Sequence, residues 1–339
     1  MLLARRPSGR LAADDFSLVT GSLPEPAEGE ALCRTILLSI DPANRAWMQG
    51  RTYRDQLDAG EVMAGFTISE VVDGNDTGLS RGTLVAGDGG WQDYAALPAR
   101  RLRAVEPIGP LTHEMSVLGI TGLTAYFGLL SVGRPQPGET VLVSAAAGAT
   151  GNVVGQLARI HGCRVVGICG SDRKGRLLTD ELGFDAAVSY RSDRFAEELR
   201  QACPQGVDVY FDNVGGPVLE RTLGLLRERG RVVFCGAVAH YDGDDRTGGI
   251  SFNPGRMVVR RLRLEGFLVS DFLPEWPSAR TALAGWVEGG SLQVLEDVVD
   301  GLDAAPTALV GLLAGDNVGK RIVRVAPDPH DPERVLGGR

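Results

Sequence analysis

The sequence predicts an α/β fold in which a doubly wound parallel sheet accompanies a separate β-rich region. From Val141 onward, apolar strand-like segments alternate with helix-like segments, which is typical of a parallel sheet with helices on both faces. Before residue 113 the chain instead shows short strand patterns between glycine turns and little helical periodicity. Its 339 residues are enough for two domains with separate cores.

The β-rich region is expected to contain strands at 31–40, 65–72 and 83–85. A pair of connecting helices follows at 111–130, and prolines at 135 and 137 mark the passage into the second region.

The second region is predicted to alternate between strands and helices. Its elements are a strand at 141–144, a helix at 151–161, a strand at 164–168, a helix at 172–182, a strand at 186–189, a helix at 194–202, a strand at 207–211, a helix at 217–229, and strands at 231–235 and 262–269. Helices near 279–288 and 304–313 and a last strand at 321–325 are expected to rejoin the first region.

The most informative stretch is the uncharged run Thr140–Ala158, in which a strand turns abruptly into a helix. Its glycines, Gly148, Gly151 and Gly155, suit a tight turn, a close backbone approach to a pyrophosphate and close helix packing. The free amides at the start of that helix would face the anion. The spacing GxxGxxxG differs from the standard GxGxxG, so the motif alone is a weak signal.

Other interpretations of this run stay open at the sequence level. An apolar run of this length can cross a membrane, but its glycines and the polar Ser144, Asn152 and Gln156 disfavour that. A glycine-rich turn without a ligand and the adenosyl-methionine site of a methyltransferase are further alternatives.

The end of the next predicted strand distinguishes between cofactors. An NAD enzyme normally places an acid there to hold the adenosine ribose, but this chain has Cys169, Gly170 and Ser171, followed by Arg173 and Lys174. A neutral strand end backed by cations suits the 2′-phosphate of NADP. Asp172 is the counter-evidence, although it can also cap the following helix. The sequence therefore predicts NADP rather than NAD.

Composition indicates a soluble enzyme that acts on small molecules. The net charge of −8 and the pI near 5.2 argue against a nucleic-acid partner. The arginine-bearing N-terminus lacks the apolar core of a secretory signal, so we expect a cytoplasmic protein without a membrane partner. The five cysteines are too dispersed for a disulfide framework or a metal clip.

Six motifs carry a family resemblance over about residues 30–325, namely Leu38–Pro42, Gly122–Tyr126, Ser144–Gly155, Phe211–Gly216, Cys235–Ala237 with Tyr241, and Gly315–Lys320. With them, the chain resembles the medium-chain dehydrogenase/reductase superfamily, and within it the zinc-independent prostaglandin reductases and 2-alkenal (double-bond) reductases. The resemblance implies a GroES-like β-rich catalytic domain at 1–118, a Rossmann NADP-binding domain at 119–270, a return to the catalytic domain at 271–326 and a flexible tail at 327–339. It also implies a homodimer.

The resemblance also implies site residues. Tyr241, after the fifth strand, would stabilise or protonate an enolate, and Tyr53 would border the substrate pocket. The expected cofactor contacts are Gly148, Ala149, Thr150, Gly151, Ser171, Lys174, Tyr190, Asn213, Cys235, Gly236, Ala237, Tyr241, Phe267, Leu268, Val269 and Asn317. Asn213 can instead be a plain turn residue before Gly215.

Zinc ligands are not found where the zinc enzymes of the superfamily carry them. The corresponding first-domain strand reads Ala64–Thr67 without a histidine, and the four histidines share no ligand spacing. We therefore expect no metal. Without zinc to polarise an alkoxide, reduction of a conjugated C=C bond is favoured over alcohol oxidation.

The sequence thus predicts NADPH-dependent reduction of α,β-unsaturated aldehydes and ketones. Quinone reduction at the same site is one alternative, and a non-catalytic NADPH-binding sensor or structural protein is another. The chain departs from the family at Ala43 and Asn44 and in the loop Asp242–Pro254. Since both segments are expected at the substrate mouth, prostaglandins are not carried over as substrates, and smaller alkenals, enones or quinones are expected.

Overall fold

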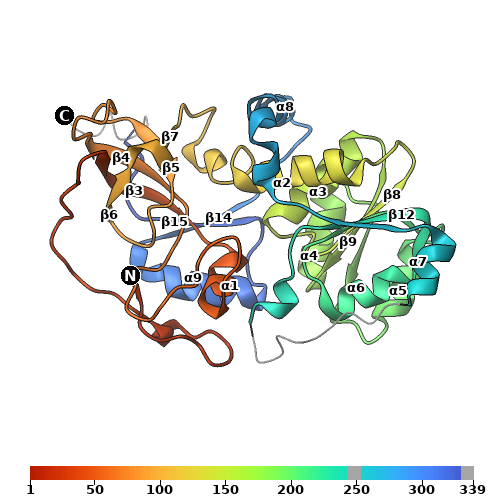
Figure 1. The fold of residues 1–339 in the computed structure, drawn as a ribbon. Helices are drawn as coiled ribbons and strands as arrows, with labels where there is room; N and C mark the ends of the chain where they lie inside the picture. The colour runs from red at the N-terminus through yellow and green to blue at the C-terminus, as the bar shows by residue number, and fades with distance from the viewer. Residues whose placement is uncertain (243–252, 330–339) are drawn as a thin grey trace.

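The computed structural model describes residues 1–242 and 253–329, and these form two lobes with one large sheet each (Figure 1). In the larger lobe, six strands pair in the order β10-β9-β8-β11-β12-β13, and every pairing is parallel. The strands are β8 (Thr140–Val143), β9 (Arg164–Cys169), β10 (Ala186–Ser189), β11 (Val207–Asp212), β12 (Leu226–Phe234) and β13 (Arg263–Gly266). The predicted doubly wound sheet is confirmed.

Helices cover both faces of this sheet because their apolar sides have two separate cores to fill (Figure 1). Val154 and Leu157 of α3 pack into one core, whereas Leu199 of α5 and Leu219 of α6 pack into the other. The helices are α3 (Ala149–Ile160), α4 (Asp172–Arg176) with its continuation Leu177–Glu181, α5 (Phe195–Ala202), α6 (Gly216–Leu223) and α7 (Pro254–Arg260).

Two predicted elements end differently in the structure. The helix expected at 217–229 stops at Leu223, because Leu226 is fully buried as the first residue of β12. Arg229 has a φ of 61°, and the pairing with β11 is irregular along this first part of β12. The strand expected at 262–269 spans only Arg263–Gly266.

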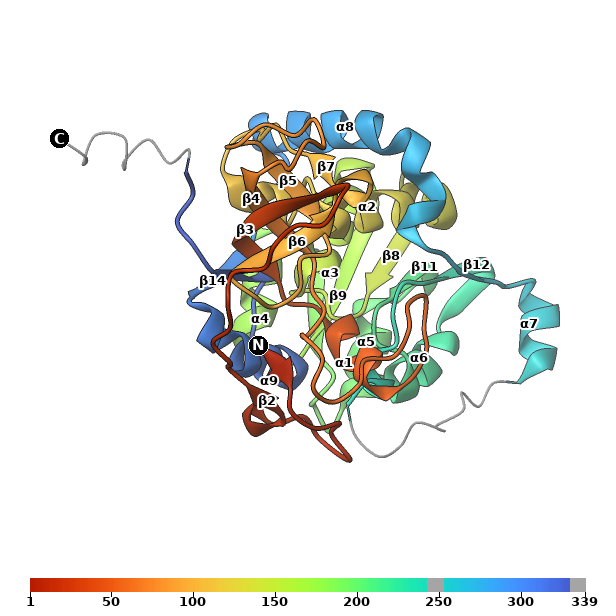
Figure 2. The same ribbon diagram turned by 60° about the vertical axis from the view of Figure 1, so that its left-hand side comes forward.

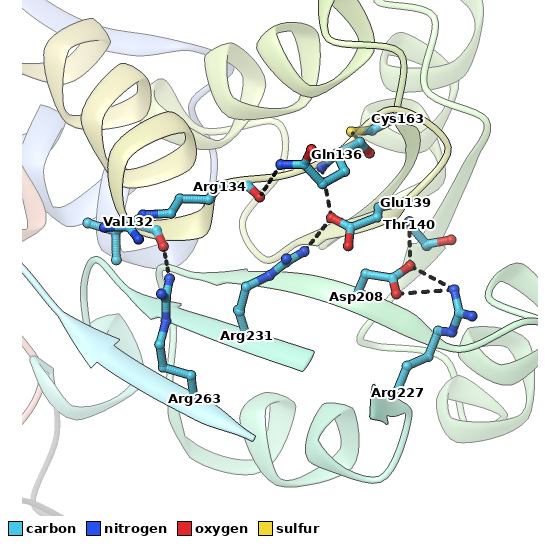
Figure 3. Close-up of polar contacts among 10 residues, drawn as sticks. All are labelled: Val132, Arg134, Gln136, Glu139, Thr140, Cys163, Asp208, Arg227, Arg231 and Arg263. Atoms are coloured by element: carbon cyan, nitrogen blue, oxygen red, sulfur yellow. Dashed lines mark hydrogen bonds and ion pairs between the residues drawn. The ribbon is translucent and has the colours of Figure 1, made fainter. Parts of the chain in front are cut away.

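The amino-terminal edge of the parallel sheet is closed by polar contacts between neighbouring segments (Figure 3). Arg231 of β12 pairs with Glu139, and Arg263 of β13 donates to the carbonyl oxygen of Val132. Asp208 of β11 accepts both the Thr140 amide and the Arg227 guanidinium. The opposite, carboxyl-terminal edge is the one available to a ligand. At that edge the strand order reverses between β8 and β11, and ligands of such sheets bind at this reversal.

The smaller lobe is a mixed sheet of order β14-β15-β3-β4-β5-β7, with β6 paired to β3. Its strands are β3 (Glu30–Ser39), β4 (Thr67–Asp73), β5 (Leu84–Gly87), β6 (Tyr94–Pro98), β7 (Arg103–Ala104), β14 (Glu296–Asp300) and β15 (Lys320–Arg324). A further pair, β1 (Leu2–Leu3) with β2 (Phe16–Ser17), stands apart. β15 pairs with β3, so the end of the chain adds a strand to this sheet. Ala279 and Leu283, from the helix predicted near 279–288, share a core with Val154 and Leu157 of α3 in the other lobe. The domain boundaries themselves stay predictions.

The remaining α-helices of the described residues connect or cover the lobes (Figures 1 and 2). They are α1 (Pro42–Gln49), α2 (Ile120–Tyr126) with its continuation Phe127–Gly133, α8 (Trp276–Glu288) and α9 (Ala305–Ala314). Buried residues of α2 and α8 share one core with α3, so the sequence-distant segments around 120 and 280 pack on the same side of the parallel sheet.

Within the part of the chain that the structure describes, none of the helices combines the length and apolar character that a membrane crossing requires. The run Thr140–Ala158, for which a membrane helix was an alternative, is instead β8, a turn and most of α3.

Candidate active site

The turn between β8 and α3 is tightly folded on itself. Ala145 has a φ of 49°, and the Gly148 amide donates to the Ala145 carbonyl at 2.9 Å. A Cβ on Gly151 would lie 2.4 Å from that carbonyl oxygen, and one on Gly155 would lie 1.9 Å from the Phe184 ring. Both glycines are therefore required by packing within this domain.

The start of α3 is suited to an anion. Gly148 is the N-cap residue of α3 and has no side chain that could cap the helix. The first amides, from Ala149, Thr150 and Gly151, therefore lack the helical acceptor that later amides find one turn earlier. Gly148, Ala149 and Thr150 are partly exposed. Such amides bind the phosphates of dinucleotides.

Asn317 belongs to a segment of the other lobe that contacts this turn through Gly319. It is buried and donates from its side chain to the Gly319 carbonyl at 2.8 Å. Gly319 in turn donates from its amide to the Ala147 carbonyl at 2.9 Å, and it bridges Gly148. The two lobes thus meet at the turn between β8 and α3.

Cations gather at the ends of β9 and β10. Ser171 caps α4 by accepting the Lys174 amide at 3.4 Å. The Lys174 ammonium donates to the Gly315 carbonyl at 2.7 Å, and Arg191 donates to the Ala314 carbonyl at 3.4 Å. Both cations therefore lie at the carboxyl end of α9, where the helix dipole favours positive charge. Burial lowers the pKa of Lys174, and Asp316 opposes that effect.

Tyr190 lies beside this group with 44% of its surface exposed. A Cβ on Gly170 would be 3.2 Å from its ring, so the absent side chain leaves the ring face open. The Arg191 guanidinium lies 5.7 Å from the ring centre. Sequence reasoning missed Arg191, although it directly follows Tyr190, which the family resemblance selected at the end of the same strand.

Asn213 holds the ends of β8 and β11 together. Its side-chain amide donates to the Ser144 carbonyl at 2.7 Å, while its backbone amide donates to the Ser144 hydroxyl at 2.9 Å. Asp212, which the sequence reasoning missed, accepts the Ser144 and Tyr210 hydroxyls and the amides of Val214 and Gly215. The expected contact of Asn213 with a cofactor stays a prediction.

Cys235, Gly236 and Ala237 follow β12 at the carboxyl-terminal edge of the parallel sheet, which we call the rim. The amides of Cys235 and Gly236 both donate to the Asp212 carbonyl, at 2.9 and 3.2 Å. Burial, the larger effect, and the charge of Asp212 raise the pKa of the Cys235 thiol to about 12. That thiol therefore stays protonated at physiological pH.

Tyr241 folds back over this rim. Its hydroxyl oxygen accepts the Ala237 amide at 3.2 Å, so the phenolic proton remains available for another acceptor. Burial raises the pKa of Tyr241 above its ordinary value, although the amide hydrogen bond opposes the shift. The phenol is a neutral donor at physiological pH.

Tyr53 follows α1 in the amino-terminal lobe. It is 66% exposed and packs edge-on against Trp47 with ring centres 6.2 Å apart. Partial burial, the largest effect, and the charge of Asp41 raise the pKa of Tyr53, while Trp47 and Arg54 oppose the shift.

Phe267, Leu268 and Val269 follow β13, next to the end of β12. Phe267 points into the core, where its ring would meet a Cβ on Gly128 at 2.5 Å and lies 6.5 Å from the Phe272 ring centre. Leu268 is 48% exposed, and the Val269 carbonyl accepts the Trp276 indole. The structure thus brings this segment to the expected edge of the sheet, with only Leu268 widely exposed.

Residues 1–242 and 253–329 contain no group of three or more His, Cys, Asp or Glu side chains that could hold a metal ion. All five cysteines are free.

Comparisons with known proteins identify the family of the chain. Two family models match, an N-terminal domain of oxidoreductases over residues 1–105 and a zinc-binding dehydrogenase domain over 149–285. The chain is 39% identical to the NADPH-dependent curcumin reductase of Escherichia coli over 96% of each protein. It is 36% identical to the NADP-dependent 2-alkenal reductase of Nicotiana tabacum, covering 90% of this chain and 89% of that protein.

The fold comparison gives the same result. The crystal structure of CurA from Vibrio vulnificus in complex with NADPH matches with a TM-score of 0.90 and 34% identity, and the match covers 96% of this chain and 99% of that one. The chain therefore belongs to the zinc-independent branch of the medium-chain dehydrogenase/reductase superfamily, a family of NADP-dependent oxidoreductases.

Proposed function

We propose that this protein reduces the C=C bond of α,β-unsaturated aldehydes and ketones with NADPH, and that Tyr241 stabilises or protonates the enolate. The observation that carries the proposal is the Tyr241 hydroxyl, which accepts the Ala237 amide and so keeps its own proton free at the cofactor rim. Preorganised donors at a developing oxyanion are usually the largest catalytic contribution. Relatives named for the reduction of curcumin, 2-alkenals and pulegone support an enone substrate class, and the first two are named as NADPH- or NADP-dependent.

The residues at the carboxyl edge of the parallel sheet fit NADPH. The uncapped start of α3, with Gly148 and Gly151, suits the pyrophosphate. Ser171, Lys174 and Arg191 offer a hydroxyl and two cations for the 2′-phosphate, beside the ring of Tyr190. Bound NADPH supplies the hydride.

The protein's own groups then act on the substrate. Hydride addition at the β-carbon moves the π electrons onto the carbonyl oxygen and produces an enolate. Tyr241 donates its hydrogen bond to that oxygen, and Asn213, Cys235, Gly236 and Ala237 keep the rim on which the phenol rests in place. Transfer of a proton from water to the α-carbon completes the saturated aldehyde or ketone.

The test is steady NADPH oxidation with a panel of small enals, enones and quinones, with product identified by mass. Saturated aldehydes and ketones from enals and enones are expected. Hydroquinones alone would favour the quinone reductase alternative. The structural similarity to the quinone oxidoreductase of Thermus thermophilus, at 27% identity, is the reason for including quinones. NADPH binding without turnover on any of these substrates would favour a sensor.

The oligomeric state and location remain proposals too. β13 is an edge strand of the parallel sheet, and near it Val258, Val259 and Leu268 are exposed. An apolar edge of this kind suits pairing with a second copy, so we expect a homodimer, and equilibrium sedimentation would test it. The cytoplasmic location predicted from the sequence stays a prediction. The part of the expected substrate loop at 243–252 lies outside the described residues.

A further inference from the structure

The residue after Tyr241 crosses from one lobe to the other. The Asp242 carboxylate accepts the Arg45 guanidinium at 3.0 Å and the Leu11 amide at 2.8 Å, both on the same oxygen. Arg45 belongs to α1, and Leu11 lies between β1 and β2, so both donors come from the amino-terminal lobe. Asp242 itself follows the helical turn Val238–His240, which comes after β12 of the parallel sheet.

The arginine in this pair is almost fully enclosed. Its side chain is 1% exposed, and the Asp242 side chain is 20% exposed. One terminal nitrogen of Arg45 donates to the Gly9 carbonyl at 2.7 Å, and the other has no hydrogen-bond partner among the described residues. Because a buried guanidinium requires acceptors, Arg45 fixes Asp242 firmly in place.

The other end of the same short segment is fixed to the cofactor rim. The Tyr241 hydroxyl accepts the Ala237 amide, and the amides of Val238 and Ala239 donate to the carbonyls of Asn213 and Val214 at 3.3 and 3.0 Å. Tyr241 thus lies between an anchor on the parallel sheet and an anchor on α1.

We propose that Arg45 and Asp242 are positioning residues, which hold the Tyr241 phenol where the enolate oxygen develops by tying its loop to the amino-terminal lobe. This inference rests on the proposed function of Tyr241. Loss of the ion pair lets the phenol move away from the substrate, which slows hydride transfer while leaving the NADPH site intact.

Asp242→Asn is the variant of choice, because the side chain keeps its shape and an oxygen for the Leu11 amide but loses its charge. Asp208→Asn is the matched control: Asp208 also accepts one backbone amide, from Thr140, and one arginine, Arg227, at the opposite edge of the sheet (Figure 3). We expect Asp242→Asn to slow hydride transfer by about tenfold without changing the Kd of NADPH, and Asp208→Asn to retain the wild-type rate.

A double-mutant cycle separates positioning from general damage to the fold. If Asp242 acts through the phenol, Asp242→Asn has no further effect on hydride transfer in a Tyr241→Phe background. Arg45→Lys, which keeps the charge, should lose less activity than Arg45→Ala. An equal loss from Asp242→Asn in both backgrounds, or none in either, would overturn the proposal.

A second measurement does not depend on activity. The chain has six tyrosines, so 3-fluorotyrosine labelling gives a simple fluorine NMR spectrum in which Tyr241→Phe identifies one resonance. That resonance should shift or broaden in Asp242→Asn but not in Asp208→Asn, and an unchanged resonance contradicts the positioning role. If the wild type reduces no enone, the proposed function fails. The fluorine spectrum still shows whether Asp242 determines the position of the Tyr241 ring.

Discussion

Lys174 and Arg191 converge from two different strand ends on the carboxyl end of α9, next to the ring of Tyr190. The sequence predicted Lys174 because it follows a strand end without an acid. It could not indicate Arg191, since only the pairing of β9 with β10 brings the two cations together. Residues that follow neighbouring strands of a parallel sheet therefore need to be considered together when a binding site is predicted.

This cluster gives the first prediction. NADPH should bind at least tenfold more tightly than NADH, a difference of about 1.4 kcal/mol, because two cations are available for the 2′-phosphate. Lys174→Ala and Arg191→Ala should each remove most of that preference in a fluorescence titration. Arg176→Ala, an exposed cation later in the same helix, is the control and should keep it. Equal affinities of the wild type for the two cofactors would refute the assignment.

The cysteines give a second prediction at the level of single residues. Burial raises the pKa of Cys33, Cys163 and Cys203 to about 11 and, with Asp212, that of Cys235 to about 12. Thiols that stay protonated are poor nucleophiles, and a protein that handles electrophilic enals benefits from this.

The native protein should accordingly retain its activity after incubation with an excess of enal, and a thiol reagent should label its cysteines only after denaturation. Rapid labelling of Cys235 with loss of turnover would contradict the account.

At the level of elements, the alternation from Val141 onward was a sound guide for β8 to β11, because these strands are short, mostly apolar and bounded by turns. The sequence reasoning missed β14 and α1. The acidic residues at 296, 297 and 300 interrupt the apolar pattern expected of a strand, so β14 was not predicted. Its pairing with β15 is supported by ion pairs of Asp297 with Arg321 and of Asp300 with Arg324. A short helix in a β-rich region has a weak periodic signal, and α1 is marked mainly by Asp41 at its N-cap and the following proline.

The third prediction concerns the packing of α3. Gly155→Ala would press a methyl group into the Phe184 ring, because a Cβ there lies 1.9 Å from the ring, and should destabilise the protein by about 1–3 kcal/mol. Gly285→Ala in α8 is the matched substitution: it is exposed and has no atom within 4 Å of the added carbon. That change should stabilise the protein by about 0.5–1 kcal/mol through helix propensity. Denaturant unfolding of the two variants measures both, and equal effects would contradict the packing argument.

At the scale of the whole molecule, the two lobes are tied at several points that sequence analysis could not foresee. The bridge between Gly148 and Gly319 and the pairing of Arg45 with Asp242 both join residues more than 150 positions apart. The family resemblance predicted that Asn317 returns to the cofactor, and the structure brings its segment to the turn between β8 and α3 through Gly319. Its contact with the cofactor stays a prediction.

A fourth prediction is metal independence. Because the residues at 1–242 and 253–329 offer no cluster of three metal-ligating side chains, turnover should survive prolonged chelation, and elemental analysis should detect no stoichiometric zinc. A tightly held zinc whose removal abolishes turnover would overturn this expectation.

The central claim is that Tyr241 stabilises the enolate, and stopped-flow hydride transfer in Tyr241→Phe tests it most directly. Since the phenol accepts the Ala237 amide and has its proton left to donate, its loss should lower the rate by roughly tenfold to a thousandfold, as for one oxyanion donor. The Kd of NADPH should change little. A variant that matches the wild type in both rate and affinity would contradict the account and leave Tyr241 as a wall of the pocket.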